Sequence, residues 1–229
     1  MQNTRLILAV TLRLMISVML TALTLCAQQT GQKELNDPGL SNPREEQPKN
    51  ICLIAGLNDR LIEKAYKDAC RTLLVANPCS WFFGGPGVAI EALNNLVQHT
   101  QKSALVNRHL GMRMSGGYNL VPNNTSGNTY RLFKKATLNL NGPFYNEKSF
   151  PSQASVPNIG PFKPNSREAR VTILLHELGH MMRGEDEKWL LLDDADDVSR
   201  SSENTDLIIK RCGNQIKILS QQASLETSR

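Results

Sequence analysis

The sequence predicts an α+β domain that is mainly helical and contains one small sheet. Three stretches lead to this prediction. Apolar residues recur at helical spacing in residues 58–74, apolar and polar residues alternate in residues 130–141, and an apolar run in residues 171–182 carries two histidines four positions apart. The chain has 229 residues, enough for one compact domain with a sizeable core even after removal of an N-terminal segment.

Residues 1–27 have the features of a secretory signal peptide. Arginines supply positive charge near the N-terminus, the apolar run of residues 14–25 is too short to span a bilayer comfortably, and Ala27 suits the position before cleavage. Cleavage would give a secreted or periplasmic protein without stable membrane insertion. Two alternatives stay open: an uncleaved signal anchor, and lipid attachment at Cys26.

The rest of the chain divides by composition into three parts. Residues 28–50 are rich in Gln, Asn, Glu, Lys and Pro, so we expect a disordered linker or pro-segment. Residues 51–219 have the apolar periodicity of a folded domain, and residues 220–229 form a polar tail. The net charge of +5 comes from scattered Lys and Arg without a basic block interleaved with aromatics, which argues against nucleic-acid binding.

The first half of the domain is expected to contain two helices. Residues 58–74 form the first, and Asn77-Pro78 ends it. The aromatic residues 81–83 precede a Gly-Gly-Pro-Gly turn, and we interpret them as core followed by a turn, with a wall of a substrate pocket as the alternative. The second helix covers residues 88–99, and the Gly-, Asn- and Ser-rich residues 111–128 predict a long loop.

The second half contains a strand followed by the helix with the two histidines. Alternation predicts a strand in residues 130–141, which Gly-Pro then stops, and several prolines predict a loop in residues 146–165. Asn165 or Ser166 is a suitable N-cap for the next helix. That helix runs to residue 183, and Gly184 is well placed to end it.

This helix carries the sequence His176-Glu177-Leu178-Gly179-His180. Residues four positions apart lie on one face of a helix, so the imidazoles of His176 and His180 can share one metal ion. Glu177 projects beside the pair, within reach of a water bound to the same metal. Gly179 leaves room for a close approach to the helix between the histidines.

Two neutral imidazoles and a nearby carboxylate are the groups that zinc-dependent hydrolysis needs. Zn²⁺ lowers the pKa of its bound water towards neutrality, and Glu177 would take the proton as the water attacks a carbonyl. The alternative interpretation is a helix with two surface histidines. His99 and His109 are weaker candidates for further ligands, because a lone histidine at a helix end is more often exposed.

A catalytic zinc site usually has three protein ligands, so a third must come from outside the motif. No histidine follows His180, but an acidic segment does. We favour Asp194, then Asp193, then Glu187, because apolar residues 189–192 can anchor the aspartates beside the helix. The rest of this acidic segment is expected to be a solvated loop. Calcium binding by its aspartates is a weaker option, since the spacing lacks an EF-hand pattern.

The motif and the apolar helix that carries it resemble those of the zincin metallopeptidases. The resemblance implies that His176 and His180 are zinc ligands, that Glu177 is the general base, and that the substrate is a peptide or protein. It also implies a sheet edge, in residues 130–140, along which an extended peptide pairs; an ordinary internal strand is the alternative. The longer metzincin pattern is missing. An aspartate after the second histidine is similar to the aspzincin arrangement, although the Gly-Thr-x-Asp surroundings of that family are absent.

Four cysteines remain once Cys26 is removed with the signal: Cys52, Cys70, Cys79 and Cys212. An even number in an exported chain predicts two disulfides, with three possible pairings. One scheme ties Cys212 back to the N-terminal helical part. Cys212 lies in a helix predicted for residues 206–219, which presents one apolar face to the domain.

The leading functional prediction is a secreted zinc metallopeptidase. One alternative is an exported module without catalysis, in which zinc is structural or absent and the surface binds a partner. Another is a zinc amidase that acts on a cell-wall component. The sequence leaves the substrate, the oxyanion-stabilising residue and the oligomeric state open.

Overall fold

The computed structural model describes residues 51–107, 111–148, 154–184, 186–195 and 197–227. The signal peptide and linker predicted for residues 1–50, and the candidate ligand His109, lie outside these residues. The described residues form the predicted α+β fold, with five helices and one three-stranded sheet. None of the described helices is both long and apolar enough to cross a membrane.

Three helices form the N-terminal part of the domain: α2 (Arg60–Leu74), α3 (Pro78–Phe82) and α4 (Ile90–Gln98). Helices α2 and α4 confirm the two predicted helices. Asn77-Pro78, which was predicted only to end the first helix, also starts α3. The Asn77 side chain caps the first turn of α3, and proline suits the first helical position. Phe83 is fully buried whereas Trp81 is 64% exposed, so only part of the aromatic stretch is core.

The sheet contains β1 (Thr100–Ser103), β2 (Met112–Pro122) and β3 (Thr129–Asn139) in the order β1-β3-β2. Strand β3 confirms the predicted strand. The loop predicted for residues 111–128 is wrong, because most of it is β2, paired antiparallel with β3. Gly116 and Gly117 form a β-bulge opposite Lys134, both with positive φ, so the glycines that suggested a loop instead bend a strand.

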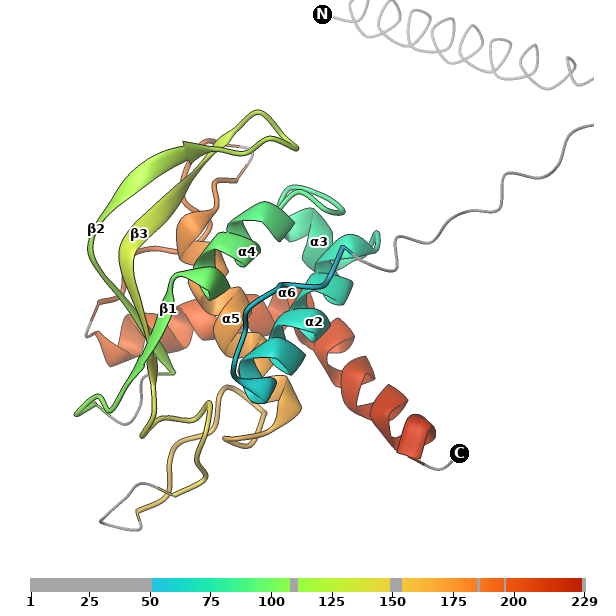
Figure 1. The fold of residues 1–229 in the computed structure, drawn as a ribbon, viewed down its shortest axis with the longest axis vertical. Coiled ribbons are helices and arrows are strands. Elements are labelled where there is room, and N and C mark those ends of the chain that lie inside the picture. The colour runs from blue at the N-terminus through green and yellow to red at the C-terminus, as the bar shows by residue number, and fades with distance from the viewer. Residues whose placement is uncertain (1–50, 108–110, 149–153, 185, 196, 228–229) are drawn as a thin grey trace, which may run out of the picture. The chain divides into compact units, whose positions relative to one another are not determined.

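The position of β3 favours the internal strand over the sheet edge, the two alternatives for residues 130–140, although β1 covers only part of its length in the described sheet. β3 is the middle strand: β2 pairs along its length on one side, and β1 pairs in parallel with residues 136–139 on the other. Figure 1 shows β2 and β3 as a long curved pair with β1 beside them. The edge strand on the far side from β1 is therefore β2.

Helix α6, Val198–Thr227, is longer than the helix predicted for residues 206–219 and extends into the predicted polar tail. The Asp197 side chain accepts a hydrogen bond from the N–H of Arg200 at 3.1 Å, which helps to start the helix early. Disulfides join Cys52 to Cys70 and Cys79 to Cys212. They confirm the prediction of two disulfides and the scheme that ties α6 back to the N-terminal helices.

Helix α5, Arg167–Met181, lies at the centre of the domain (Figure 1). It contacts α2, α4, α6, β2 and β3. Twelve of its 15 residues are buried, so it is covered on almost every side rather than on one face. The hydroxyl of Ser166 accepts a hydrogen bond from the N–H of Ala169 at 3.1 Å, which confirms the predicted N-cap.

The end of α5 differs from the prediction that placed it at Gly184. The helix ends at Met181, and Met182 has an extended backbone with φ −92° and ψ 150°. The carbonyl of Met182 accepts a hydrogen bond from the N–H of Leu190 at 3.0 Å. A bridge to a segment that returns along the helix therefore ends α5, rather than a glycine cap.

Candidate metal centre

Two histidines of α5 and one aspartate from the segment before α6 converge at one point. Nε2 of His176 lies 3.1 Å from Nε2 of His180. Oδ2 of Asp194 lies 3.0 Å from Nε2 of His176 and 3.4 Å from Nε2 of His180. Both histidines are buried and Asp194 is half-buried. The three side chains thus form a group that could hold a metal ion.

These three atoms have the spacing that a small cation requires. At these distances, the lone pairs of two imidazole nitrogens and one carboxylate oxygen can point at a common centre. Ligands about 2.0–2.1 Å from a tetrahedral zinc ion lie about 3.3 Å from one another. The observed separations of 3.0, 3.1 and 3.4 Å are close to that tetrahedral edge. The donor set of two nitrogens and one carboxylate also suits zinc better than calcium, which prefers oxygen ligands alone.

The other predicted ligands lie elsewhere. Asp193 pairs with Arg131, at 2.7 Å between Oδ1 and Nη1. Glu187 is exposed in a turn with φ 60°. His99 is exposed at the end of α4, where its Nδ1 contacts the carbonyl of Asn95. Among the three acidic candidates, the structure thus brings only Asp194 to the histidines.

Gly179 explains how Asp194 reaches α5. The N–H of Leu191 donates to the carbonyl of Gly179 at 3.2 Å, and the Leu191 side chain packs directly on that glycine. A Cβ at position 179 would lie 2.6 Å from Cδ1 of Leu191, closer than such contacts occur. The room expected beside Gly179 is therefore occupied by the apolar segment that precedes Asp194.

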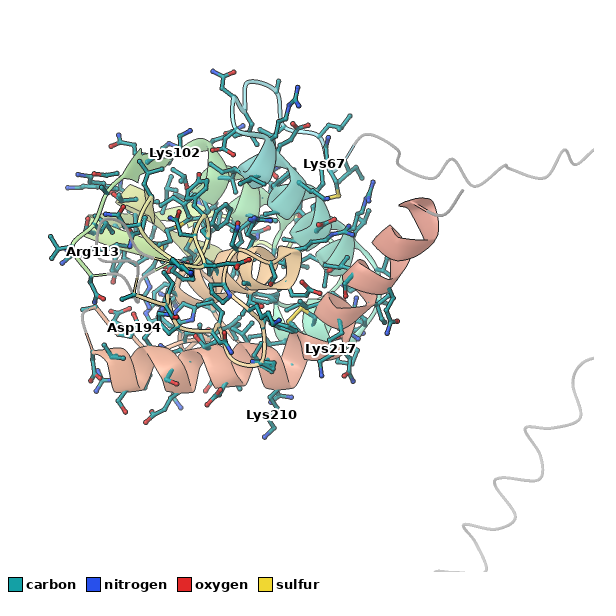
Figure 2. All side chains as sticks on the ribbon, turned by 90° about the horizontal axis from the view of Figure 1, so that it is seen from below. Lys67, Lys102, Arg113, Asp194, Lys210 and Lys217 are labelled. Carbon is teal, nitrogen blue, oxygen red and sulfur yellow. A yellow bond between two sulfur atoms is a disulfide. The ribbon has the colours of Figure 1, made fainter. Side chains whose placement is uncertain are left out.

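Two neighbouring residues of α6 contact the side chains of this group. Nδ2 of Asn204 donates to the carbonyl of Leu192 at 2.8 Å and to Oδ2 of Asp194 at 3.3 Å. Oγ1 of Thr205 lies 3.0 Å from Nδ1 of His176. Figure 2 shows Asp194 beside the N-terminal half of α6.

Sequence reasoning missed Asn204 and Thr205 as part of the site. A signal was present: Asn204 is four residues before Ile208 and eight before Cys212, so it lies on the apolar face of its helix. Asn204 is indeed only 7% exposed. A polar side chain on a buried helix face needs a partner, and here the partners are the Asp194 segment and its carboxylate.

Burial and charge set the protonation of the group. Burial lowers the pKa of His176, against the opposing hydrogen bond with Asp194. Burial alone would raise the pKa of Asp194, but its hydrogen bonds with His176 and His180 hold it well below the ordinary value. A neutral imidazole next to an ionised carboxylate is the form in which these side chains bind cations.

Glu177 lies next to His176 and opens onto the same cleft. Burial, and then the charge of Asp194, raises the pKa of Glu177 well above its ordinary value. The cleft has a volume of about 320 Å³, and its lining includes the three metal-group residues and Glu177. Apolar side chains also line it, among them Met112, Met114, Phe133, Ile159 and Ile173.

Comparison with known proteins finds no family model, curated protein or solved structure that matches this chain. The site is therefore described by its own residues. It contains two histidines one helical turn apart, an aspartate close to both, and a glutamate of raised pKa that lines the same cleft.

Proposed function

We propose that this protein is an exported zinc-dependent peptidase, similar to the zincins in the chemistry of its site. The observation that carries the proposal is the convergence of His176, His180 and Asp194 at the wall of a cleft that also contains Glu177. Two disulfides support export, because such bonds persist mainly in oxidising compartments.

His176, His180 and Asp194 would hold the metal. Bound zinc would lower the pKa of a water molecule and polarise the carbonyl of the scissile bond. Thr205 contacts the imidazole of His176 and Asn204 donates to the carboxylate of Asp194, so two of the three side chains are already supported in this orientation.

Glu177 is the proposed general base. As a carboxylate it can accept a proton from the attacking water and then donate it to the leaving amine. Burial raises the pKa of Glu177, and the positive charge of a bound cation would oppose that shift, which favours the ionised form that a base requires. Glu177 lines the cleft together with both histidines, which places it beside the reacting groups.

Strand β2 is the candidate for substrate binding by strand addition. Residues 112–114 of β2 line the cleft, and β2 pairs with β3 on one side only in the described sheet. An edge strand offers backbone N–H and C=O groups to an extended peptide. The apolar wall of the cleft would receive side chains of that peptide. This moves the peptide-pairing role from β3, where the sequence suggested it, to β2.

The test measures metal content and peptide hydrolysis in the same preparations. Wild-type protein should bind one zinc ion per chain, and His180→Ala should lose it. Glu177→Gln should retain zinc and lose activity on a peptide library by about 100-fold or more, since the general base is removed. Glu168→Gln, a carboxylate-to-amide change in the first turn of the same helix, is the matched control and should behave as wild type.

The outcomes distinguish the alternatives. Zinc retained by the wild type without turnover of peptides or cell-wall fragments would contradict the peptidase and favour a module without catalysis. Turnover of cell-wall fragments alone would favour the amidase. Full activity of Glu177→Gln would remove this residue from the mechanism.

A further inference from the structure

Arg131 of β3 is a fully buried arginine enclosed by three aromatic rings. Its guanidinium carbon lies 3.9 Å from the ring centre of Trp189, 5.1 Å from that of Tyr118 and 5.8 Å from that of Phe133. The Arg131 side chain is 2% exposed, and its buried Nε has no hydrogen-bond partner among the residues that the structure describes. A cation withdrawn this far from water is costly, so the contacts that hold it must compensate.

The rings around Arg131 come from two separate parts of the fold. Tyr118 and Phe133 belong to the paired strands β2 and β3. Trp189 belongs to the segment that follows α5, and its ring also contacts that of Tyr118, with centres 6.1 Å apart. Arg131 therefore joins the sheet to the segment that delivers Asp194.

Arg131 also contacts Asp193, the neighbour of Asp194. Nη1 of Arg131 donates to Oδ1 of Asp193 at 2.7 Å. The Asp193 carboxylate is 68% exposed, so the ion pair joins a buried guanidinium to an exposed carboxylate. Because Asp193 and Asp194 are consecutive, fixing the first carboxylate restricts where the second can go.

The segment around Asp194 has little regular structure of its own to keep it in place. Among the described residues between α5 and α6, the only backbone pairing of strand type is the isolated bridge between Arg183 and Trp189. Glu187 and Ala195 have positive φ, so turns occur on both sides of the aspartates. Ordering such a segment costs conformational entropy, which contacts outside the segment must offset.

We propose that Arg131 is a positioning residue for the metal centre: by holding Trp189 and Asp193 it keeps Asp194 directed at His176 and His180. The claim that this orientation serves a metal rests on the proposed function. A metal binds more tightly to a side chain that is already in place than to one that must first be ordered, because less conformational entropy is lost on binding. Arg131 therefore acts on metal affinity through Asp194. Arg131 itself does not line the cleft.

The test uses the full chain and two substitutions at one position. Arg131→Met keeps a long apolar side chain among the rings and removes the charge. Arg131→Lys keeps the charge but loses the flat guanidinium that stacks on Trp189. Lys134→Met removes an exposed cation from the same strand and is the matched control.

Two measurements are made on each variant. Backbone hydrogen exchange in metal-free protein follows the N–H groups of Leu190 and Leu191, whose bonds to Met182 and Gly179 report the docked segment. Competition with a chelator gives the zinc dissociation constant. Arg131→Met should exchange faster at both N–H groups and bind zinc about 10- to 100-fold more weakly. Arg131→Lys should fall between this variant and the wild type, and Lys134→Met should match the wild type.

If the N–H groups of Leu190 and Leu191 exchange in Arg131→Met at the wild-type rate, the proposal is overturned, because the segment is then held in place without Arg131. A lowered melting temperature with unchanged zinc affinity would also overturn it, leaving a role in stability alone. If the wild-type chain binds no zinc, the proposed function fails, whereas the exchange measurement in metal-free protein still decides whether Arg131 holds the segment.

Discussion

The hydroxyl oxygen of Thr205 lies 3.0 Å from Nδ1 of His176 and so joins α6 to the helix that carries both histidines. If Nε2 of His176 binds a metal, Nδ1 must carry the proton, and the Thr205 oxygen is placed to accept it. In that metal-bound form the contact would hold the imidazole with Nε2 directed at Asp194 and His180.

Thr205→Val is expected to weaken zinc binding with little change of shape. Valine keeps the volume and branching of threonine but cannot accept the hydrogen bond from His176. Loss of such a supporting contact typically costs about 10- to 100-fold in metal affinity. The measurement is zinc titration against a competing chelator, with the far-ultraviolet circular dichroism spectrum as a check on folding.

Thr205→Ser is the matched control, since it keeps the hydroxyl, and its zinc affinity should stay near that of the wild type. Equal affinity for the valine and serine variants would show that the hydrogen bond does not orient His176.

Gly179→Ala is expected to disturb the site through packing. The added Cβ would lie 2.6 Å from Cδ1 and 2.7 Å from Cγ of Leu191, so Leu191 has to move away from α5. Such overpacking usually costs about 1–3 kcal/mol in the free energy of unfolding. Because Leu191 is three residues before Asp194, zinc affinity should fall as well. Urea denaturation and zinc titration measure the two effects.

Gly213→Ala provides the comparison within another helix. The nearest atom to a Cβ there is Cγ2 of Ile209 at 3.3 Å, a contact that a small side-chain shift relieves. Alanine is also the better helix former by about 1 kcal/mol. Gly213→Ala should therefore be neutral or stabilising, and an equal loss of stability in both variants would contradict the packing argument.

Asp59 should make the stability of the fold sensitive to acid. Burial alone would raise its pKa, but the N–H groups of Ile62 and Leu61, the ammonium of Lys102 and the hydroxyl of Tyr145 together hold the pKa below 3.8. A carboxyl group whose pKa is lower in the folded state stabilises the fold above its unfolded pKa. This stabilisation is lost as the pH falls through the lower, folded-state pKa.

Asp59→Asn should thus be less stable than the wild type at neutral pH, and the difference should shrink as the pH falls below about 4. Asparagine keeps an oxygen that can cap α2, so the substitution chiefly removes the charge. Urea denaturation at a series of pH values measures the difference. Asp206→Asn, at an exposed position of α6, is the control. A difference that stays constant with pH would show that the charge of Asp59 is unimportant.

Local sequence signals predicted the helices better than the sheet. The N-cap Ser166 and the helical spacing around α2 depend on neighbours within one or two turns, and both predictions are confirmed. Strand β2 was missed because Gly116 and Gly117 are typical of loops, and only pairing with β3 turns them into a bulge. The early start of α6 was missed because its first turns are polar and lack apolar periodicity; contacts with the distant residues His176 and Asp194 add to the local cap of Asp197.

The sequence alone determined that His176 and His180 face the same way, because helical periodicity is a local property of the chain. It ranked Asp194 ahead of Asp193 and Glu187, but the three are close in sequence and chemically alike, so it left the alternatives open. The tertiary structure distinguishes them. Leu191 packs on Gly179, Asp193 forms an ion pair with Arg131, and Asp194 faces the two imidazoles. Each of these contacts joins residues that are distant in sequence, and such contacts exist only once the sheet, α5 and α6 have packed together.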